Sequence, residues 1–156
     1  MSDESKFDLA AAISRSPGPA PKALIQLAEP GAVFSVLDAS ITFPTDRKAT
    51  AGARDTKPMR RVVVLQCTMF CQSGQPETLL VVPCSASTSL GVGDLRIPEG
   101  EAGFTGSRVI ALTSLVQPIL KSDLVKHHGN VSVDTLVELR RSVFTLLSLT
   151  TDRKFP

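Results

Sequence analysis

The chain has 156 residues and a mass of 16.6 kDa, which suits one domain with a short appendage and leaves little room for two independent cores. Hydrophobic residues make up 42% and charged residues 21%, so collagen-like, coiled-coil and wholly disordered chains are excluded. A net charge of +2 is too small to indicate a nucleic-acid-binding protein by itself. The sequence has neither the roughly 18 consecutive apolar residues of a spanning helix nor a secretory signal, so we expect a cytoplasmic protein.

Residues 1–28 are interpreted as an N-terminal extension and linker. The apolar spacing over Phe7–Ile13 predicts a short amphipathic helix, which the proline-rich segment 16–21 ends. Lys22–Leu27 predicts one or two further helical turns before the turn at Pro30 and Gly31. We therefore expect the main domain to span residues 29–149, followed by a polar tail at 150–156.

The central part of the chain predicts a β-rich core of five or six strands, because its apolar runs are rich in Val, Leu and Phe and are bounded by Gly or Pro. The predicted strands are Ala32–Leu37, Val62–Cys67, Thr78–Cys84, Asp94–Ile97, Ser107–Leu112 and Leu115–Ile119. The segment Asp38–Met59 between the first two is longer than a compact domain usually leaves without structure. Loops of this length are often functional.

The last third of the chain predicts helices. Ser122 is placed to cap a short helix that runs to His127 and stops at Gly129, and Ser132 is placed to cap a second one. In the second helix, one apolar face is expected from residues at helical spacing. These are Val133, Leu136, Val137, Val143, Phe144 and Leu147. The predicted fold class is mainly β with helices (α+β), a small twisted antiparallel barrel with a packed C-terminal helix.

The segment Gln72–Pro76 predicts the turn of a hairpin between the second and third strands. A symmetric pairing about this turn places Cys67 opposite Thr78 and Arg61 opposite Cys84, and it brings Arg60 beside Ser85 at the open end. A guanidinium offers two donors to a phosphate, and a hydroxyl can add a third. The alternative is ordinary: Arg before a strand is usually a solvated charge, and Ser after one is usually a turn residue.

Positive charge is concentrated next to Arg60. Residues 46–61 contain six basic and two acidic residues, a net of +4, whereas the whole chain carries only +2. The basic residues are Arg47, Lys48, Arg54, Lys57, Arg60 and Arg61. A basic loop beside a phosphate-sized site is what single-stranded RNA would require electrostatically. A solvated loop without a ligand is the alternative.

Other residues that could carry chemistry have structural explanations. His127 and His128 could exchange protons, but we expect them to interact with the end of a helix as dipole partners. Cys67 and Cys71 are expected to share one face of a strand and to pack in the core. No spacing indicates a metal site or a nucleotide fingerprint, so no metal and no cofactor is expected.

Two of these strands carry a resemblance to a known family. The segment Arg60-Arg-Val-Val-Val-Leu-Gln66 resembles the Arg-Pro-apolar strand of MazF/PemK-type toxins, and Leu79-Leu-Val-Val-Pro-Cys-Ser-Ala86 resembles their strand that ends in Pro-x-Thr. Pro30-Gly31-Ala-Val-Phe, residues 107–124 and the closing amphipathic helix extend the similarity over roughly residues 29–149.

The resemblance implies a small SH3-like barrel that forms a homodimer, cleaves RNA without a metal ion and is inhibited by an antitoxin. The family's catalytic arginine corresponds to Arg60 and its catalytic threonine to Ser85. The sequence departs from the family where Arg61 replaces a proline and where Val116 replaces a basic residue. The acid that assists catalysis in the family has no single counterpart, although Asp46 and Asp55 lie in the corresponding loop.

Two other function classes remain open at the level of the sequence. A CcdB-like gyrase inhibitor shares the barrel, but that family ends in a tail with a Trp, and this chain has no Trp. A degenerate barrel that only binds a partner is the other alternative, which the substitution at Val116 keeps open. The leading hypothesis is an endoribonuclease toxin that acts on single-stranded RNA.

Overall fold

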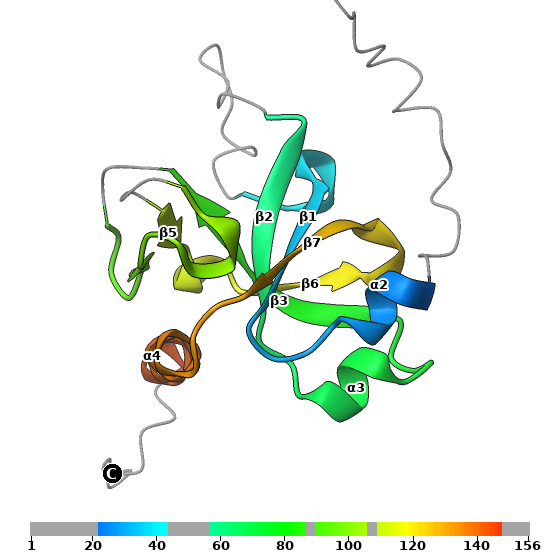
Figure 1. Cartoon of the computed structure of the whole chain (residues 1–156). Helices are drawn as coiled ribbons and strands as arrows, with labels where there is room; N and C mark the ends of the chain where they lie inside the picture. The colour runs from blue at the N-terminus through cyan, green and yellow to red at the C-terminus, as the bar shows by residue number, and fades with distance from the viewer. Residues whose placement is uncertain (1–21, 44–56, 87–89, 106–108, 148–156) are drawn as a thin grey trace, which may run out of the picture.

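The computed structural model describes residues 22–43, 57–86, 90–105 and 109–147 (Figure 1). In these residues, one antiparallel sheet of seven strands is accompanied by the helices α2 (Lys22–Gln26), α3 (Thr68–Gln72) and α4 (Val133–Leu146). The α+β class is therefore confirmed. The helix predicted at Phe7–Ile13 and the polar tail lie outside the described residues. None of the described helices is both long and apolar enough to cross a membrane.

The centre of the sheet is formed by β1 (Ala32–Leu37), β2 (Met59–Val64) and β3 (Thr78–Ser85). β3 bonds to three partners along its length: first β6 (Gln117–Leu120), then β2, and at its last residues β5 (Val109–Ala111). β4 (Leu95–Ile97) and β7 (Leu124–Asn130) end the two sides of the sheet. In the described residues these two strands do not pair, so the barrel is not closed.

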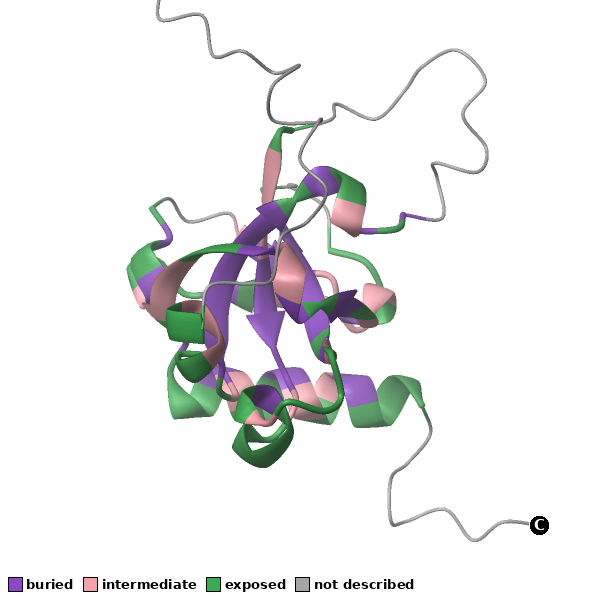
Figure 2. Ribbon diagram, turned by 90° about the vertical axis from the view of Figure 1, so that its right-hand side faces the viewer, coloured by how far each residue is buried: buried purple, intermediate pink, exposed green. Residues whose placement is uncertain are grey.

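Side chains of the central strands alternate between two hydrophobic clusters, because successive residues of a strand point to opposite faces. Val36, Val62 and Val64 belong to one cluster, and we call this side the Arg60 face. Val63 and Val82 belong to the other, which we call the Arg61 face. Figure 2 shows the buried strands between their outer layers. This alternation decides which polar side chains meet at the strand ends.

α4 covers the cluster on the Arg61 face and begins where the sequence predicts. The Ser132 hydroxyl caps the helix by accepting a hydrogen bond from the Thr135 backbone N–H at 3.2 Å. Val143 of the predicted apolar face is buried, but the prediction is wrong in part, because it missed the buried Leu139 and four of its members are exposed. The exposed members are Val133, Val137, Phe144 and Leu147.

The helix predicted from Ser122 to His127 is wrong. A short 3-10 helix, η5 (Lys121–Asp123), leads into β7, which pairs with β1 along its outer edge. The N–H and C=O groups on this edge of β1 are thereby satisfied, as buried backbone groups require. Pairing across the sheet overrides the local helix signals. His127 and His128 therefore lie on a strand, and the predicted role as helix-dipole partners is also wrong.

The second strand is shorter at its end than predicted. β2 stops at Val64, so Leu65, Gln66 and Cys67 lie outside the strand, and the helix α3 that follows them ends at Gln72, the first residue of the predicted turn. The Lys121 ammonium donates to the carbonyls of Phe70 and Ser73 at the end of α3, at 2.9 and 2.6 Å, and so stabilises this helix. Cys67 precedes α3, so it does not face Thr78 and does not share a strand face with Cys71.

The segment before β1 packs on the domain. Leu24 of α2 contacts the cluster on the Arg60 face, and Ala28 is fully buried in it. The helical turns predicted at Lys22–Leu27 are confirmed by α2.

Candidate active site

The pairing of β2 with β3 brings Arg60 and Ser85 to the same place. The observed pairs are Val62 with Pro83, Val63 with Val82 and Val64 with Val81, which is the predicted register. When this register is extended toward the open end of the hairpin, where β2 begins and β3 ends, Arg61 lies opposite Cys84 and Arg60 lies beside Ser85. Since Arg60 and Ser85 alternate with Arg61 and Cys84, the first two project from the Arg60 face and the other two from the Arg61 face.

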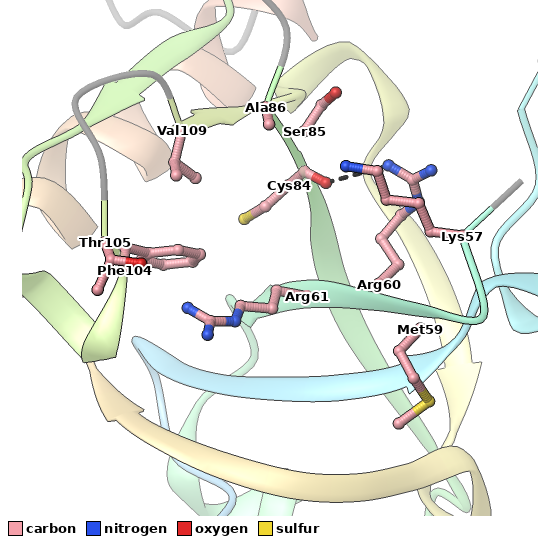
Figure 3. Close-up of a pocket in the computed structure, with 10 residues that line it drawn as sticks. All are labelled: Lys57, Met59, Arg60, Arg61, Cys84, Ser85, Ala86, Phe104, Thr105 and Val109. Atoms are coloured by element: carbon pink, nitrogen blue, oxygen red, sulfur yellow. Dashed lines mark hydrogen bonds between the residues drawn. The ribbon is translucent and has the colours of Figure 1, made fainter. Parts of the chain in front are cut away.

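A cavity of about 250 Å³ opens at this end of the strands (Figure 3). It includes side chains from both faces, because it lies where β2 and β3 end. The lining residues from these strands and the adjoining chain are Lys57, Met59, Arg60, Arg61, Cys84, Ser85 and Ala86, and Phe104, Thr105 and Val109 form the opposite wall. A polar, cationic edge therefore borders an apolar wall.

Arg60 is held firmly in this cavity. Its Nε donates to Oδ1 of Asp38 at 2.7 Å, and the two side chains are only 9% and 8% exposed. Its Nη1 donates to the Cys84 carbonyl at 3.3 Å, and the guanidinium stacks over the Phe43 ring with 4.6 Å to the ring centroid. A guanidinium has five N–H donors, so donors remain for an anion in the cavity.

Asp38 is a residue of the candidate site that the sequence analysis missed. It opens the 3-10 helix η1 (Asp38–Ser40) directly after β1, and its backbone N–H donates to the Pro58 carbonyl at 3.4 Å. Because β1 pairs with β2, Asp38 lies beside the start of β2. The predicted positions for an acid, Asp46 and Asp55, lie outside the described residues. The sequence did contain a signal for this residue, since Asp38 is an acidic residue that immediately follows the predicted first strand.

Ser85 is the last residue of β3 and is partly exposed at the rim of the cavity. Its backbone pairs with Ile110 of β5, which fixes the position of the hydroxyl. Figure 3 shows this hydroxyl directed away from Phe104 and Arg61. It can therefore donate to an anion that approaches Arg60.

Arg61 has a different environment on the other face. Its Nη1 donates to the Gly103 carbonyl at 3.0 Å, and its guanidinium lies over the Phe104 ring, 4.8 Å from the centroid. Both contacts come from the segment of η3 (Glu101–Gly103) and the residue after it. Of the other predicted RNA-binding residues, Lys57 also lines the cavity, whereas Arg47, Lys48 and Arg54 lie outside the described residues.

The Cys84 thiol does not provide a nucleophile in this cavity. Burial raises its pKa to about 12, although the nearby Arg61 and Arg60 act in the opposite direction. The thiol is therefore protonated at neutral pH. Among the residues that the structure describes, no group of three or more His, Cys, Asp or Glu side chains could hold a metal ion. The described polar side chains that line the cavity include the guanidinium groups of Arg60 and Arg61, the Lys57 ammonium and the Ser85 hydroxyl.

The site belongs to a small α+β domain in which an antiparallel sheet presents a cationic cavity at the ends of two adjacent strands. No protein-family model matches the chain, and no curated protein resembles it in sequence. Solved structures do resemble it in fold, and they include endoribonucleases and MazF toxins.

An endoribonuclease from a mycobacterial species, solved with its cognate antitoxin, is 12% identical with a TM-score of 0.57, and the match covers 83% of this chain and 99% of that one. MazF from Deinococcus radiodurans is 16% identical with a TM-score of 0.56, over 78% and 97% of the two chains. The toxin MazF-mt6 from Mycobacterium tuberculosis is 12% identical with a TM-score of 0.56, over 76% and 98%. The chain therefore has the fold of the MazF toxins.

Proposed function

We propose that this protein is a toxin-type endoribonuclease that cleaves single-stranded RNA without a metal ion. The observation that carries the proposal is Arg60, which Asp38 holds at the cavity where Ser85 ends the adjacent strand. The fold supports it, because the solved structures that resemble this chain include MazF endoribonucleases. The same comparisons do not favour the CcdB-like alternative.

In the proposed reaction the RNA 2′-hydroxyl attacks the adjacent phosphate. The bond from the 2′ oxygen to phosphorus forms as its proton passes to water, and negative charge grows on the other phosphate oxygens. The bond to the 5′ oxygen breaks, and this leaving oxygen takes up a proton from water. Arg60 stabilises this charge through its remaining N–H groups, and Ser85 donates one more hydrogen bond. Because Asp38 and Phe43 already hold the guanidinium, little reorganisation is needed as the charge develops.

The test is incubation of the purified protein with single-stranded RNA of mixed sequence, and with RNA that carries one deoxyribose at the cleaved position. We expect 5′ fragments that end in a 2′,3′-cyclic phosphate, resistance of the deoxyribose substrate, and the same rate with a chelator. Gyrase supercoiling measured in parallel tests the CcdB-like alternative. If the RNA stays intact and gyrase is inhibited, the hypothesis of an endoribonuclease is rejected.

RNA binding is proposed for the basic segment of the chain. The residues are Arg47, Lys48, Arg54, Lys57 and Arg61. Contacts between cationic side chains and phosphates release counterions, so binding should weaken steeply with salt. Neutralising Arg47, Lys48, Arg54 and Lys57 together should flatten that dependence in a filter-binding titration. An unchanged salt slope would reject this part of the proposal.

Partners and location are proposed on the same basis. We infer a cytoplasmic homodimer that an antitoxin protein inhibits, because the mycobacterial structure contains a cognate antitoxin and because apolar residues of α4 are exposed. Sedimentation at micromolar concentration should give a dimer. A monomer alone would reject the dimer.

The division at residues 28 and 29 is also a proposal. Removal of residues 1–21 should leave the unfolding temperature unchanged, since α2 and the sheet remain. Removal of residues 1–28 should still leave a folded domain, but at a cost of about 2 kcal/mol, because Leu24 and Ala28 pack against the core. Thermal unfolding of both truncated proteins tests the boundary, and loss of cooperative unfolding would place the segment inside the domain.

A further inference from the structure

A row of polar side chains crosses the Arg61 face from the cavity to the edge of the sheet. Arg61 of β2 pairs with Ser35 of β1, and Ser35 pairs with Lys126 of β7. His128 lies two residues beyond Lys126, on the same face, and its Nε2 is 2.6 Å from the Ser35 hydroxyl oxygen. The row therefore consists of Arg61, Ser35, His128 and Lys126.

The row carries positive charge that no carboxylate of the described residues pairs with. Among the described residues, neither Arg61 nor Lys126 has a carboxylate oxygen within 4.0 Å. Lys126 is exposed, and Arg61 and His128 are partly exposed, so a ligand can reach all three. Ser35 is buried and serves to position the His128 ring. An arrangement of this kind attracts an anion.

His128 is poised to respond to such an anion. Burial lowers the pKa of its imidazole, and Arg61, Lys126 and His127 lower it further, so the surroundings favour the neutral ring. On the packed side η3 covers this part of β7, and its Glu101 carboxylate accepts hydrogen bonds from the backbone N–H of Ser132 and the Thr135 hydroxyl at the start of α4. Negative charge brought beside His128 would favour its protonated form.

We propose that Arg61, His128 and Lys126 bind a second phosphate group of the RNA strand, next to the phosphate held at Arg60 and Ser85. The inference rests on the proposed function and identifies where the strand leaves the cavity. Arg61 lines the cavity, so the row starts there. It ends at β7, two strand spacings or about 10 Å away, where the sheet has a free edge among the described strands.

The first test measures binding of single-stranded RNA that carries deoxyribose at the cleaved position, by fluorescence anisotropy over a range of salt concentrations. Lys126→Glu should weaken binding about tenfold and reduce the salt slope by ~0.7, the value for one phosphate contact on a single strand. Lys22→Glu is the matched control, because α2 packs against the opposite face and the change in charge is the same. It should alter affinity less than twofold.

The second test follows His128 by NMR titration. Binding of the same RNA should raise the pKa of His128, so affinity should increase as the pH falls from 8 to 6. His128→Gln should remove this pH dependence. His127→Gln is the control, since His127 faces Phe34 on the other side of the strand. This variant should keep the pH dependence, shifted slightly toward higher pH because His127 no longer lowers the pKa of His128.

The outcomes separate the row from the active site. If Lys126→Glu and Lys22→Glu lose RNA affinity equally, or if RNA binding leaves the pKa of His128 unchanged in a protein that cleaves RNA, the second phosphate site is rejected. The proposed endoribonuclease function is not affected by either result. A wild-type protein that neither binds nor cleaves RNA overturns both. A loss of RNA affinity in Lys126→Glu but not in Lys22→Glu, with the maximal cleavage rate retained, supports the second phosphate site.

Discussion

Arg60 and Arg61 are consecutive residues of one strand, yet their surroundings are opposite in kind. Arg60 is nearly buried, bonded to Asp38 and stacked on Phe43. Arg61 stacks on Phe104, donates to a carbonyl and has no carboxylate within 4.0 Å among the described residues. The difference teaches that the pleat of a strand can divide two tasks between identical side chains. A fixed cation suits transition-state stabilisation, and an accessible one suits binding.

The largest expected effect follows from removing the fixed cation. Arg60→Ala should reduce cleavage by about 1000-fold or more, and Arg60→Lys should restore little, because an ammonium lacks the planar fork of donors. The variant also removes the ion pair between Arg60 and the buried Asp38, which costs about 3 kcal/mol. The double variant with Asp38→Ala should regain stability but not activity. Normal cleavage by folded Arg60→Ala protein would contradict the proposed mechanism.

The hydroxyl beside Arg60 has the next largest expected effect. Ser85→Ala should lower the single-turnover rate by ~100-fold, as expected for one lost donor to a developing negative charge. Ser85→Thr should keep most of the activity, because it retains the hydroxyl. The unfolding temperature serves as the control for both variants. Equal rates for the Ala and Thr variants would show that the hydroxyl takes no part.

Asp38 distinguishes the two arginines, so altering it should make Arg60 resemble Arg61. Asp38→Asn keeps an acceptor for Nε but removes the charge that holds the guanidinium, and we expect kcat to fall about tenfold. The affinity for cleavage-resistant RNA should change less than kcat. An unchanged kcat would mean that burial alone positions Arg60, and the role assigned to Asp38 would be wrong.

The smallest effect is expected for Arg61. Arg61→Ala should raise KM about fivefold and change kcat less than twofold, because the interaction is present in the bound substrate and in the transition state alike. Steady-state kinetics with Arg60→Lys as the companion variant test the contrast. A fall in kcat as large as that for Arg60 would remove the distinction between the two residues.

Local pattern predicts several elements of this fold correctly. β1 occupies the predicted residues, Ser132 caps α4, and the register of β2 and β3 follows from the symmetry of their apolar runs. Each of these three features depends on residues that are close together in the chain or on the position of apolar runs. The segment 122–127 also carries helix signals, yet only its first two residues are helical, in η5, and from Leu124 it forms β7, because β1 offers an edge for pairing that no local signal reveals.

The sequence by itself determined the α+β class, the central strands and the register that directs Arg60 toward Ser85, since two apolar runs symmetric about one connection pair antiparallel. Only the tertiary structure decided which acid meets Arg60 and which residues share the face of Arg61. Asp38 reaches Arg60, and Lys126 and His128 reach Ser35, through pairing between strands far apart in the chain. Such contacts depend on the global arrangement of the sheet, which spacing along the chain does not encode.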